Sequence, residues 1–336
     1  MTTPFLRSLR CMFPDAKISY LVGNWSKDAI KYNSNINNFL IFDETIFFNI
    51  KKMPNLIRFI LEIRKKNFDA AFILDASFIY PVIIYLTGIS RRIGFDRNGE
   101  GFALTDRIEF KYSHHHINNY LNLLTILNTD SIFASLNMEF NYSKTDEEFA
   151  FHFYSDNKFC LNDFIIGIAP GGAKNIAESM PLRQWPIEYY IELIKKIKEK
   201  FNSKIILFGG YNDLDICGKI EEVFMDKIYN LSGKTTLAQA AAIIKSCNYF
   251  ITHDSGLMHL AAAMGITTIS IFGPTEPLEK APLNSDKFVL FKKINCSPCY
   301  KDGIYPDCSH KTCLRLIKPD DIINLINNEF YYKNHF

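Results

Sequence analysis

Residues 249–273 read YFITHDSGLMHLAAAMGITTISIFG, and this stretch decides the fold. Two apolar runs, Tyr249–Thr252 and Thr267–Phe272, flank the segment Gly256–Met264, which is rich in alanine. The outer runs have the length and the β-branched residues of buried strands, and a helix with small side chains can pack closely on a sheet. The stretch therefore predicts a strand, a helix and a second strand of a parallel α/β sheet.

The same alternation extends through the rest of the chain, which indicates a doubly wound α/β architecture. Further strands are expected at Lys17–Gly23, Ala70–Asp75, Arg92–Phe95, Phe164–Ala169 and Lys204–Phe208. Further helices are expected at Pro4–Met12, Asn55–Lys66, Pro81–Thr87, Ile117–Leu127, Ile187–Phe201, Leu214–Phe224, Thr236–Ser246 and Pro319–Asn328. An open α/β domain normally begins with a strand, but this sequence begins with a helical segment, so the first strand of the N-terminal domain is expected to be missing.

The 336 residues exceed the usual size of one hydrophobic core and predict two domains. We expect an N-terminal Rossmann-like domain over 1–155, a second Rossmann-like domain over 156–318, and a C-terminal helix and tail over 319–336. The polar stretch Asn141–Glu148 is the expected linker, with the boundary near residue 155.

The composition places the chain among globular proteins, with 48% hydrophobic and 22% charged residues. The net charge of +2 argues against a dedicated nucleic-acid binder. No apolar run reaches the roughly 18 residues that a membrane span needs, and no signal peptide is recognisable at the N-terminus. A cytoplasmic location is therefore expected.

Four expected strand-to-helix turns carry small or polar residues, and parallel strands bring such turns to one edge of the sheet. They are Gly171-Gly172-Ala173, Gly209-Gly210, Ser232-Gly233-Lys234-Thr235 and Asp254-Ser255-Gly256. Glycine lets a phosphate approach the backbone, and the helix that follows supplies free N–H groups. One such turn alone is more simply a turn, but four in one domain predict a diphosphate site that needs no metal.

The segment from Asp254 to His259 is the most informative part of this edge. His259 lies one helical turn after Ser255, so both side chains can face the same cleft. The simpler alternative makes Asp254 or Ser255 only a helix cap and His259 a core or surface residue.

Arg183, just before the helix at Ile187, could hold a phosphate with two hydrogen bonds, or could be a surface residue. The stretch Gly233-Lys234-Thr235 is not a P-loop, because Ile228 stands where that motif needs its first glycine. No G-x-G-x-x-G follows a strand, so the signature of a dinucleotide oxidoreductase is lacking.

Two further clusters could bind a metal. The C-terminal cysteines Cys296, Cys299, Cys308 and Cys313 could form a zinc site, although free thiols in a reducing compartment are the default interpretation. His114-His115-His116 has no partner at ligand spacing and is better explained as the start of a helix.

The ordered motifs resemble those of the ADP-heptose:lipopolysaccharide heptosyltransferases, the glycosyltransferase family 9. The resemblance covers nearly the whole chain and is strongest at Asp254-Ser-Gly-Leu-Met-His and Phe272-Gly-Pro-Thr-Glu-Pro. It continues at Ile168-Ala-Pro-Gly-Gly, Arg183-Gln-Trp-Pro, Leu207-Phe-Gly-Gly, Leu231-Ser-Gly-Lys-Thr-Thr-Leu, Thr3-Pro, Phe13-Pro-Asp-Ala, Phe68-Asp and Arg92-Ile-Gly-Phe. It implies a GT-B fold, in which two Rossmann-like domains face each other across a cleft, with the acceptor bound on the N-terminal side.

The resemblance also implies inverting transfer of heptose from ADP-heptose to a lipopolysaccharide core acceptor, without a cofactor, because the ADP-sugar is itself a substrate. The implied donor-binding residues are Gly171, Gly172, Ala173, Arg183, Asp213, Thr235, Asp254, Ser255, Gly256 and His259. Among them, Asp213 would hold the ribose hydroxyls, the backbone of Thr235 the adenine, and Asp254 the sugar hydroxyls. At Gly172 and Ala173 many family members carry hydroxyl residues, so this chain lacks those side-chain donors.

A second departure concerns the general base. The family places a Gly-Asp shortly before its Thr-Thr-Pro motif, and here Thr2-Thr3-Pro4 follows Met1 directly. The catalytic Asp is therefore expected upstream of Met1, through a truncated or misassigned start. The alternatives are a transferase of another nucleotide sugar on the same scaffold, and a non-catalytic nucleotide-sugar-binding protein. The resemblance implies an anionic lipid-linked sugar as acceptor, at the cytoplasmic face of the inner membrane. Residues 51–111 carry eleven Lys or Arg against seven Asp or Glu, which suits an acidic acceptor at a membrane surface but fits an ordinary solvated face equally well.

Overall fold

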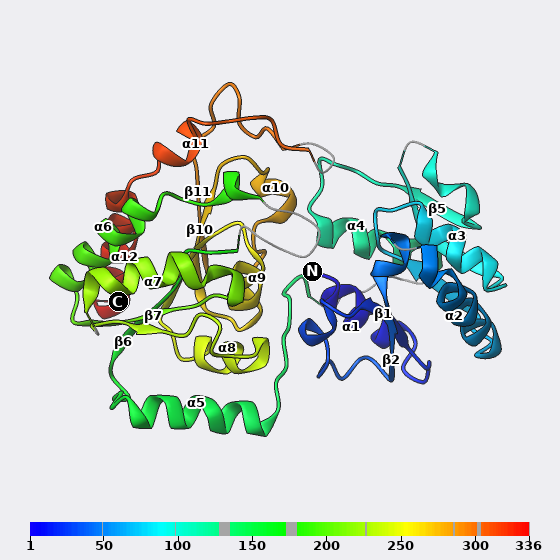
Figure 1. Cartoon of the computed structure of the whole chain (residues 1–336), viewed down its shortest axis with the longest axis horizontal. Coiled ribbons are helices and arrows are strands. Elements are labelled where there is room, and N and C mark those ends of the chain that lie inside the picture. The colour runs from blue at the N-terminus through cyan, green and yellow to red at the C-terminus, as the bar shows by residue number, and fades with distance from the viewer. Residues whose placement is uncertain are drawn as a thin grey trace. The chain divides into compact units, whose positions relative to one another are not determined.

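The structure is a computed structural model that describes residues 1–48, 50–97, 99–127, 135–172, 180–225, 227–284, 286–300 and 304–335 (Figure 1). The chain divides into two compact units, Met1–Leu136 and Asn137–Phe336. Within the described ranges, no helix is long and apolar enough to cross a membrane.

Among its described residues, the N-terminal unit contains nine main helices and strands. Its helices are α1 (Thr3–Met12), α2 (Met53–Lys65), α3 (Ile79–Leu86) and α4 (His116–Asn122), and its strands are β1 (Ser19–Gly23), β2 (Asn38–Phe42), β3 (Ala70–Ile73), β4 (Arg91–Asp96) and β5 (Asp106–Glu109). The strands are parallel and form two sheets, β1-β2 and β3-β4-β5.

The two sheets of this unit share one apolar layer. Leu21 of β1 and Leu40 of β2 pack with Ile73 of β3, beneath Phe59 and Ile63 of α2. Among the described residues β1 and β3 are not paired. The expected absence of a first strand stays a prediction.

The C-terminal unit is built on one six-stranded parallel sheet. Its strands are β6 (Phe164–Ala169), β7 (Ser203–Leu207), β8 (Tyr229–Asn230), β9 (Tyr249–His253), β10 (Thr267–Phe272) and β11 (Lys287–Phe291), in the order β11-β10-β9-β6-β7-β8. Its helices are α5 (Lys144–Asp156), α6 (Ile187–Lys200), α7 (Leu214–Phe224), α8 (Leu237–Ile244), α9 (Gly256–Ala263), α10 (Pro277–Lys280), α11 (Thr312–Arg315) and α12 (Pro319–His335).

Side chains that alternate along the strands fill a separate core on each face of this sheet. Ile166 and Ile168 of β6 belong to the core beneath α6, α7 and α12, whereas Ile165 and Ala169 belong to the core beneath α5 and α8. Gly167 lies between them, where a Cβ would come within 2.7 Å of the Phe250 ring. Coverage on both faces explains why these strands are almost uniformly apolar.

The boundary between the units differs from the expected one near residue 155. The expected linker contains the start of α5, where Ser143 and Asp146 form a capping box. Ala150 of α5 is buried, and Tyr154 donates a hydrogen bond to the carbonyl oxygen of Ile243 in α8 (2.6 Å). The helix α5 therefore belongs to the C-terminal unit, and so does α12, which packs on α6.

Candidate functional site

The strand order of the C-terminal unit contains a topological switch point. After β6 the chain proceeds outward through β7 and β8, and it then returns to the other side of β6 through β9, β10 and β11. The direction therefore reverses between β6 and β9, which pair in parallel. In open α/β sheets, ligands bind beyond the carboxyl ends of the strands at such a switch point. The turn at Gly171-Gly172 and the segment Asp254-Ser255 follow these two strands.

The turn after β6 lies against the segment after β9. Gly172 has a φ of +89°, which a side chain would strain, and a Cβ there would come within 3.0 Å of Ser255 Cβ. Ser255 caps α9, because its hydroxyl accepts a hydrogen bond from the backbone N–H of Met258 (3.4 Å). The cap and the N-terminus of α9 thus meet the glycine turn, and backbone N–H groups gather where an anion could bind.

Asp213 ties the turn after β6 to the turn after β7. Its Oδ1 accepts a hydrogen bond from the backbone N–H of Gly172 (2.8 Å), and its Oδ2 accepts one from the N–H of Gly210 (2.8 Å). The side chain fits only because Gly171 has none, since a Cβ there would lie 2.2 Å from Asp213 Cγ. Each carboxylate oxygen has a second lone pair and can accept a further hydrogen bond. The contact with ribose hydroxyls stays a prediction.

The turn after β8 joins the same edge. The N–H of Gly233 donates a hydrogen bond to the carbonyl oxygen of Gly209 (2.9 Å). Thr235 is half-buried and directly precedes Thr236, which caps α8 through a capping box with Gln239. All four turns expected from the sequence are therefore linked along one edge of the sheet.

Asp254 is a buried carboxylate at this edge with several basic side chains around it. It is only 4% exposed, and its Oδ2 lies 3.4 Å from Nη1 of Arg183. Burial alone would raise the pKa of this carboxyl, but Arg183, His259, Lys280 and the hydroxyl of Thr275 outweigh it and lower the pKa. Asp254 is therefore ionised at neutral pH, and the side chains of Arg183 and Lys280 act on its negative charge. Such surroundings suit a ligand with additional negative charge, such as a diphosphate.

Arg183 is held at this edge by its neighbours in the chain. It ends the short turn Pro181–Arg183, and Trp185 beyond it is 1% exposed. The indole N–H of Trp185 donates a hydrogen bond to the carbonyl oxygen of Ile317 (3.1 Å). This anchor fixes the backbone next to Arg183, whose side chain is itself 16% exposed and retains N–H donors for a ligand.

His253, the last residue of β9, lies beneath the glycine turn. It is fully buried, its Nδ1 is 3.2 Å from the hydroxyl oxygen of Tyr190, and among the described residues its Nε2 has no hydrogen-bond partner. That nitrogen lies 3.9 Å from where a Cβ of Gly172 would stand. Burial first, and then the charge of Arg183, lower the pKa of His253 to about 3, so the imidazole is neutral at pH 7.

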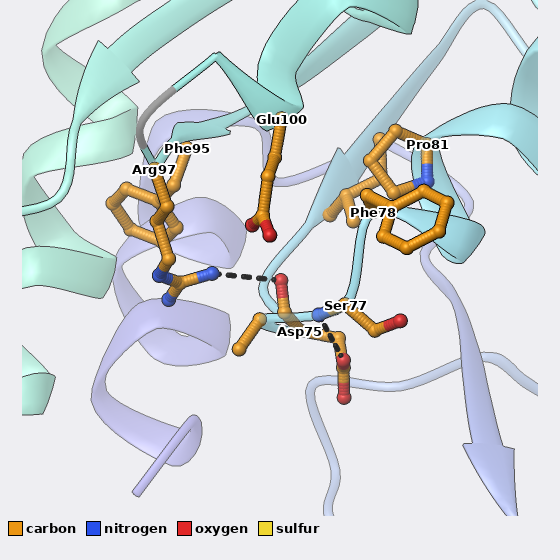
Figure 2. Close-up of a pocket in the computed structure, with 9 residues that line it drawn as sticks. Asp75, Ser77, Phe78, Pro81, Phe95, Arg97 and Glu100 are labelled. Carbon is orange, nitrogen blue, oxygen red and sulfur yellow. Dashed lines mark hydrogen bonds between the residues drawn. The ribbon is translucent and has the colours of Figure 1, made fainter. Parts of the chain in front are cut away.

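The N-terminal unit has a shallow hollow at the carboxyl ends of β3 and β4, with a cavity volume of about 10 Å³ and an opening to solvent (Figure 2). Arg97 reaches it over the rings of Phe110 and Phe95, with its guanidinium carbon 4.1 Å and 5.1 Å from their centroids. Its Nη1 donates a hydrogen bond to the carbonyl oxygen of Asp75 (3.1 Å), and the side chain of Glu100 points into the same space. A cation, carboxylates and aromatic rings together can bind a polar, sugar-like group.

The family model described as glycosyltransferase family 9 (heptosyltransferase) matches residues 56–308, well over half of the chain. The chain belongs to glycosyltransferase family 9. Lipooligosaccharide heptosyltransferase 2 of Campylobacter jejuni is 24% identical over 336 residues, which cover 98% of this chain and 93% of the relative.

Solved structures of family 9 share the fold. A family 9 glycosyltransferase from Veillonella parvula matches 97% of this chain and 92% of its own, with 23% identity and a TM-score of 0.81. The E. coli ADP-heptose lipopolysaccharide heptosyltransferase II matches 99% and 95%, with 20% identity and a TM-score of 0.75. The predicted family and the predicted α/β fold of GT-B type are confirmed.

The structure of this family 9 chain brings together most of the predicted donor-binding residues. Gly171, Gly172, Asp213, Ser255 and Asp254 lie at the switch point as described above. Arg183 and His259 lie there too, and both lower the pKa of Asp254. Gly256 begins α9, and Thr235 lies on the neighbouring turn. Ala173 lies outside the described residues. The role of each residue in binding a ligand stays a prediction.

Three further residues of this site were not among the predicted ones. His253 directly precedes Asp254, and Thr275 lies in the quoted Phe-Gly-Pro-Thr motif, so both could have been selected from the sequence. Lys280 is at the end of α10, and only the fold shows that its charge acts on Asp254.

The C-terminal cysteines are free in this structure. Burial raises the pKa of the Cys299 thiol, and nearby Cys313, Cys308 and Cys296 raise it further, so these four sulfur groups lie in one neighbourhood. Among the described residues, however, no group of three or more His, Cys, Asp or Glu side chains could hold a metal ion. The zinc alternative stays a prediction.

The buried imidazole of His253 predicts how stability depends on pH. The unfolded chain protonates this residue near its ordinary pKa of 6.5, whereas the folded chain keeps it neutral down to about pH 3. Below pH 6.5 the unfolded state therefore binds more protons, and the free energy of unfolding falls as the pH falls. Between pH 7 and pH 5 we expect this group to account for a loss of about 2 kcal/mol.

Urea unfolding at the two pH values tests this expectation. The His253→Asn variant, which has no proton to gain, should lose about 2 kcal/mol less than the unchanged chain. His152→Asn, a change at an exposed histidine, is the matched control and should behave like the unchanged chain. An identical pH dependence in all three proteins would contradict a neutral, buried His253.

Proposed function

We propose that this chain transfers heptose from ADP-heptose to a sugar of the lipopolysaccharide core, with inversion at the anomeric carbon. The main support is the positively charged switch point, where two glycine turns, the N-terminus of α9 and Arg183 gather around the ionised Asp254. Membership of family 9 supports the reaction type, and the printed names of the matched relatives support heptose as the sugar.

The proposed reaction uses the C-terminal unit to bind the donor and stabilise its leaving group. The acceptor hydroxyl attacks the anomeric carbon, the bond to the diphosphate breaks, and ADP leaves from the opposite face of the sugar. Arg183, Lys280 and the N-terminus of α9 stabilise the negative charge that grows on the diphosphate. Because two side-chain cations perform this role, we propose that no metal or cofactor takes part. A general base receives the proton of the acceptor hydroxyl as the new bond forms.

We propose that the N-terminal unit binds the acceptor, which is an anionic, lipid-linked sugar. The hollow at the carboxyl ends of β3 and β4 supports binding of the sugar part, because Arg97 offers N–H donors and Glu100 offers acceptors to hydroxyl groups. Desolvation lowers the pKa of Arg97, which shows that its guanidinium is partly removed from water. In such surroundings a charge-assisted hydrogen bond is stronger than in open solvent. The reaction then takes place at the cytoplasmic face of the inner membrane.

Product analysis tests the proposed function directly. With ADP-heptose and a heptose-deficient lipopolysaccharide acceptor, we expect release of ADP and addition of one heptose to the acceptor, detected by mass spectrometry. The rate should be unchanged in the presence of EDTA. Transfer from a different ADP- or UDP-sugar would identify another transferase of this fold. Binding of ADP in calorimetry, with no product from any donor, would instead favour a nucleotide-sugar-binding protein.

A further inference from the structure

Helix α2 of the N-terminal unit has two rows of apolar residues, of which one is packed in the core and the other is exposed. Its inward face consists of Leu56, Phe59, Ile60 and Ile63, which pack against the strands and α3. A second row, Met53, Ile57 and Leu61, follows at intervals of four residues, and these side chains are 43%, 55% and 49% exposed. The helix therefore presents an apolar stripe to solvent beside its buried face.

The stripe continues onto helix α3, which lies next to α2 in Figure 1 and contacts it. Tyr85 and Leu86 of α3 are 57% and 49% exposed. Arg64, one turn beyond Leu61, lines the same surface hollow as these two residues and Arg92. We call the exposed residues Met53, Ile57, Leu61, Tyr85 and Leu86 the α2–α3 face.

Basic side chains surround this face. Residues 51–66 contain six Lys or Arg and one Glu, so that the segment carries a net charge of +5 although the whole chain carries only +2. Arg58, Arg64, Lys65 and Lys66 are exposed. Beside α3, the guanidinium carbon of Arg92 lies 5.2 Å from the ring centroid of Tyr85.

We propose that the α2–α3 face is a docking surface for an anionic phospholipid bilayer. An amphipathic helix with exposed apolar residues and a rim of Lys and Arg is the combination that lies in a membrane interface, with its apolar side chains among the acyl chains. Each Lys or Arg near an anionic surface contributes about 1 kcal/mol, and long basic side chains can extend to the head groups. The proposal concerns a surface outside the donor site and does not depend on which sugar is transferred.

The charge distribution favours a bilayer over a protein partner. The exposed residues Arg58, Arg64, Lys65 and Lys66 share one sign of charge, which complements the negative surface of an anionic bilayer. Helix α7 of the C-terminal unit offers a contrast, because its Val223 is 45% exposed but stands beside Glu221 and Glu222. An anionic membrane would repel that surface, so Val223 provides a matched control.

Co-sedimentation with vesicles tests the proposal on the whole chain. We expect binding to vesicles of phosphatidylglycerol and phosphatidylethanolamine, little binding to pure phosphatidylcholine, and weaker binding as salt increases, because ions screen the basic rim. The double variant Ile57→Glu, Leu61→Glu should bind the anionic vesicles at least about tenfold more weakly. Val223→Glu should bind as the unchanged chain does.

A second variant keeps the test independent of any loss of folding. Arg64→Gln with Lys65→Gln leaves the apolar stripe intact and should also weaken binding and reduce its salt dependence. Circular dichroism checks that each variant folds, and ADP binding in solution should be unchanged in all of them. Equal binding to anionic and neutral vesicles, or unchanged binding of the Glu double variant, would overturn the proposal. So would a dimer in the absence of vesicles that the double variant converts to a monomer, because the face would then join two copies of the chain.

Discussion

The Arg183→Ala variant should transfer sugar at least about a hundredfold more slowly than the unchanged chain, by analogy with the loss of one oxyanion donor. Arg183 is the side chain that pairs with Asp254, and it is held in place by the buried Trp185. Charge on the leaving diphosphate grows in the transition state, so the loss should fall mainly on kcat. Steady-state kinetics with ADP-heptose measure it.

Arg183→Lys is the matched control for the charge. Lysine keeps the positive charge but loses the planar pair of donors, so its turnover should lie between the other two proteins. Removing the guanidinium also leaves the buried Asp254 with less compensation, which can destabilise the fold by a few kcal/mol. Urea unfolding therefore has to accompany the kinetics. Unchanged kinetics in the folded Ala variant would remove Arg183 from the site.

The Asp213→Ala variant should bind ADP about 10- to 100-fold more weakly, because the N–H groups of Gly172 and Gly210 each lose a charge-assisted acceptor worth about 1.5–3 kcal/mol. The two turns then lose the group that holds them in register. Calorimetry with ADP measures the change in affinity. A fall in thermal stability without ligand is expected as well, because Asp213 is 8% exposed and its carboxylate is hydrogen-bonded within the fold.

Pyrophosphate as a second ligand separates the two roles of Asp213. If the carboxylate mainly orders the turns, the Ala variant should lose affinity for pyrophosphate as well as for ADP. If it mainly contacts the ribose, pyrophosphate should bind unchanged and only ADP should bind more weakly. Asp213→Asn, which keeps one acceptor oxygen, should give an intermediate loss. An Ala variant with unaltered affinity for both ligands would contradict either role.

The sequence predicted the buried elements of the fold well and the short or exposed ones poorly. Strands such as Phe164–Ala169 and helices such as Ile187–Lys200 have a clear period because they pack on two cores. The strand Asp106–Glu109 was missed because an edge position allows it to be polar, and Tyr229–Asn230 is too short to show a pattern. The polar start of α5 was taken for a linker because capping residues are also typical of loops.

The same limit applies to the site. Glycines and hydroxyl residues after strands revealed the edge, because parallel strands bring their carboxyl ends together whatever the details of packing. The partners of Asp254 could not be derived in this way. Lys280 comes from a short helix and Thr275 from a loop after another strand, and only the folded chain places them near Asp254. Likewise, the use of both Asp213 oxygens by backbone N–H groups depends on the exact course of two turns.

The close approach of Gly171 to Asp213 constrains how this protein can diverge. No side chain can appear at position 171 while the carboxylate occupies the space beside it, since even one added carbon would overlap the Asp213 Cγ. A smaller residue at position 213 would remove that obstacle, but the N–H groups of Gly172 and Gly210 would then lose their hydrogen-bond acceptor. The two positions should therefore covary among relatives, and a mutational path that changes one before the other should pass through an impaired intermediate.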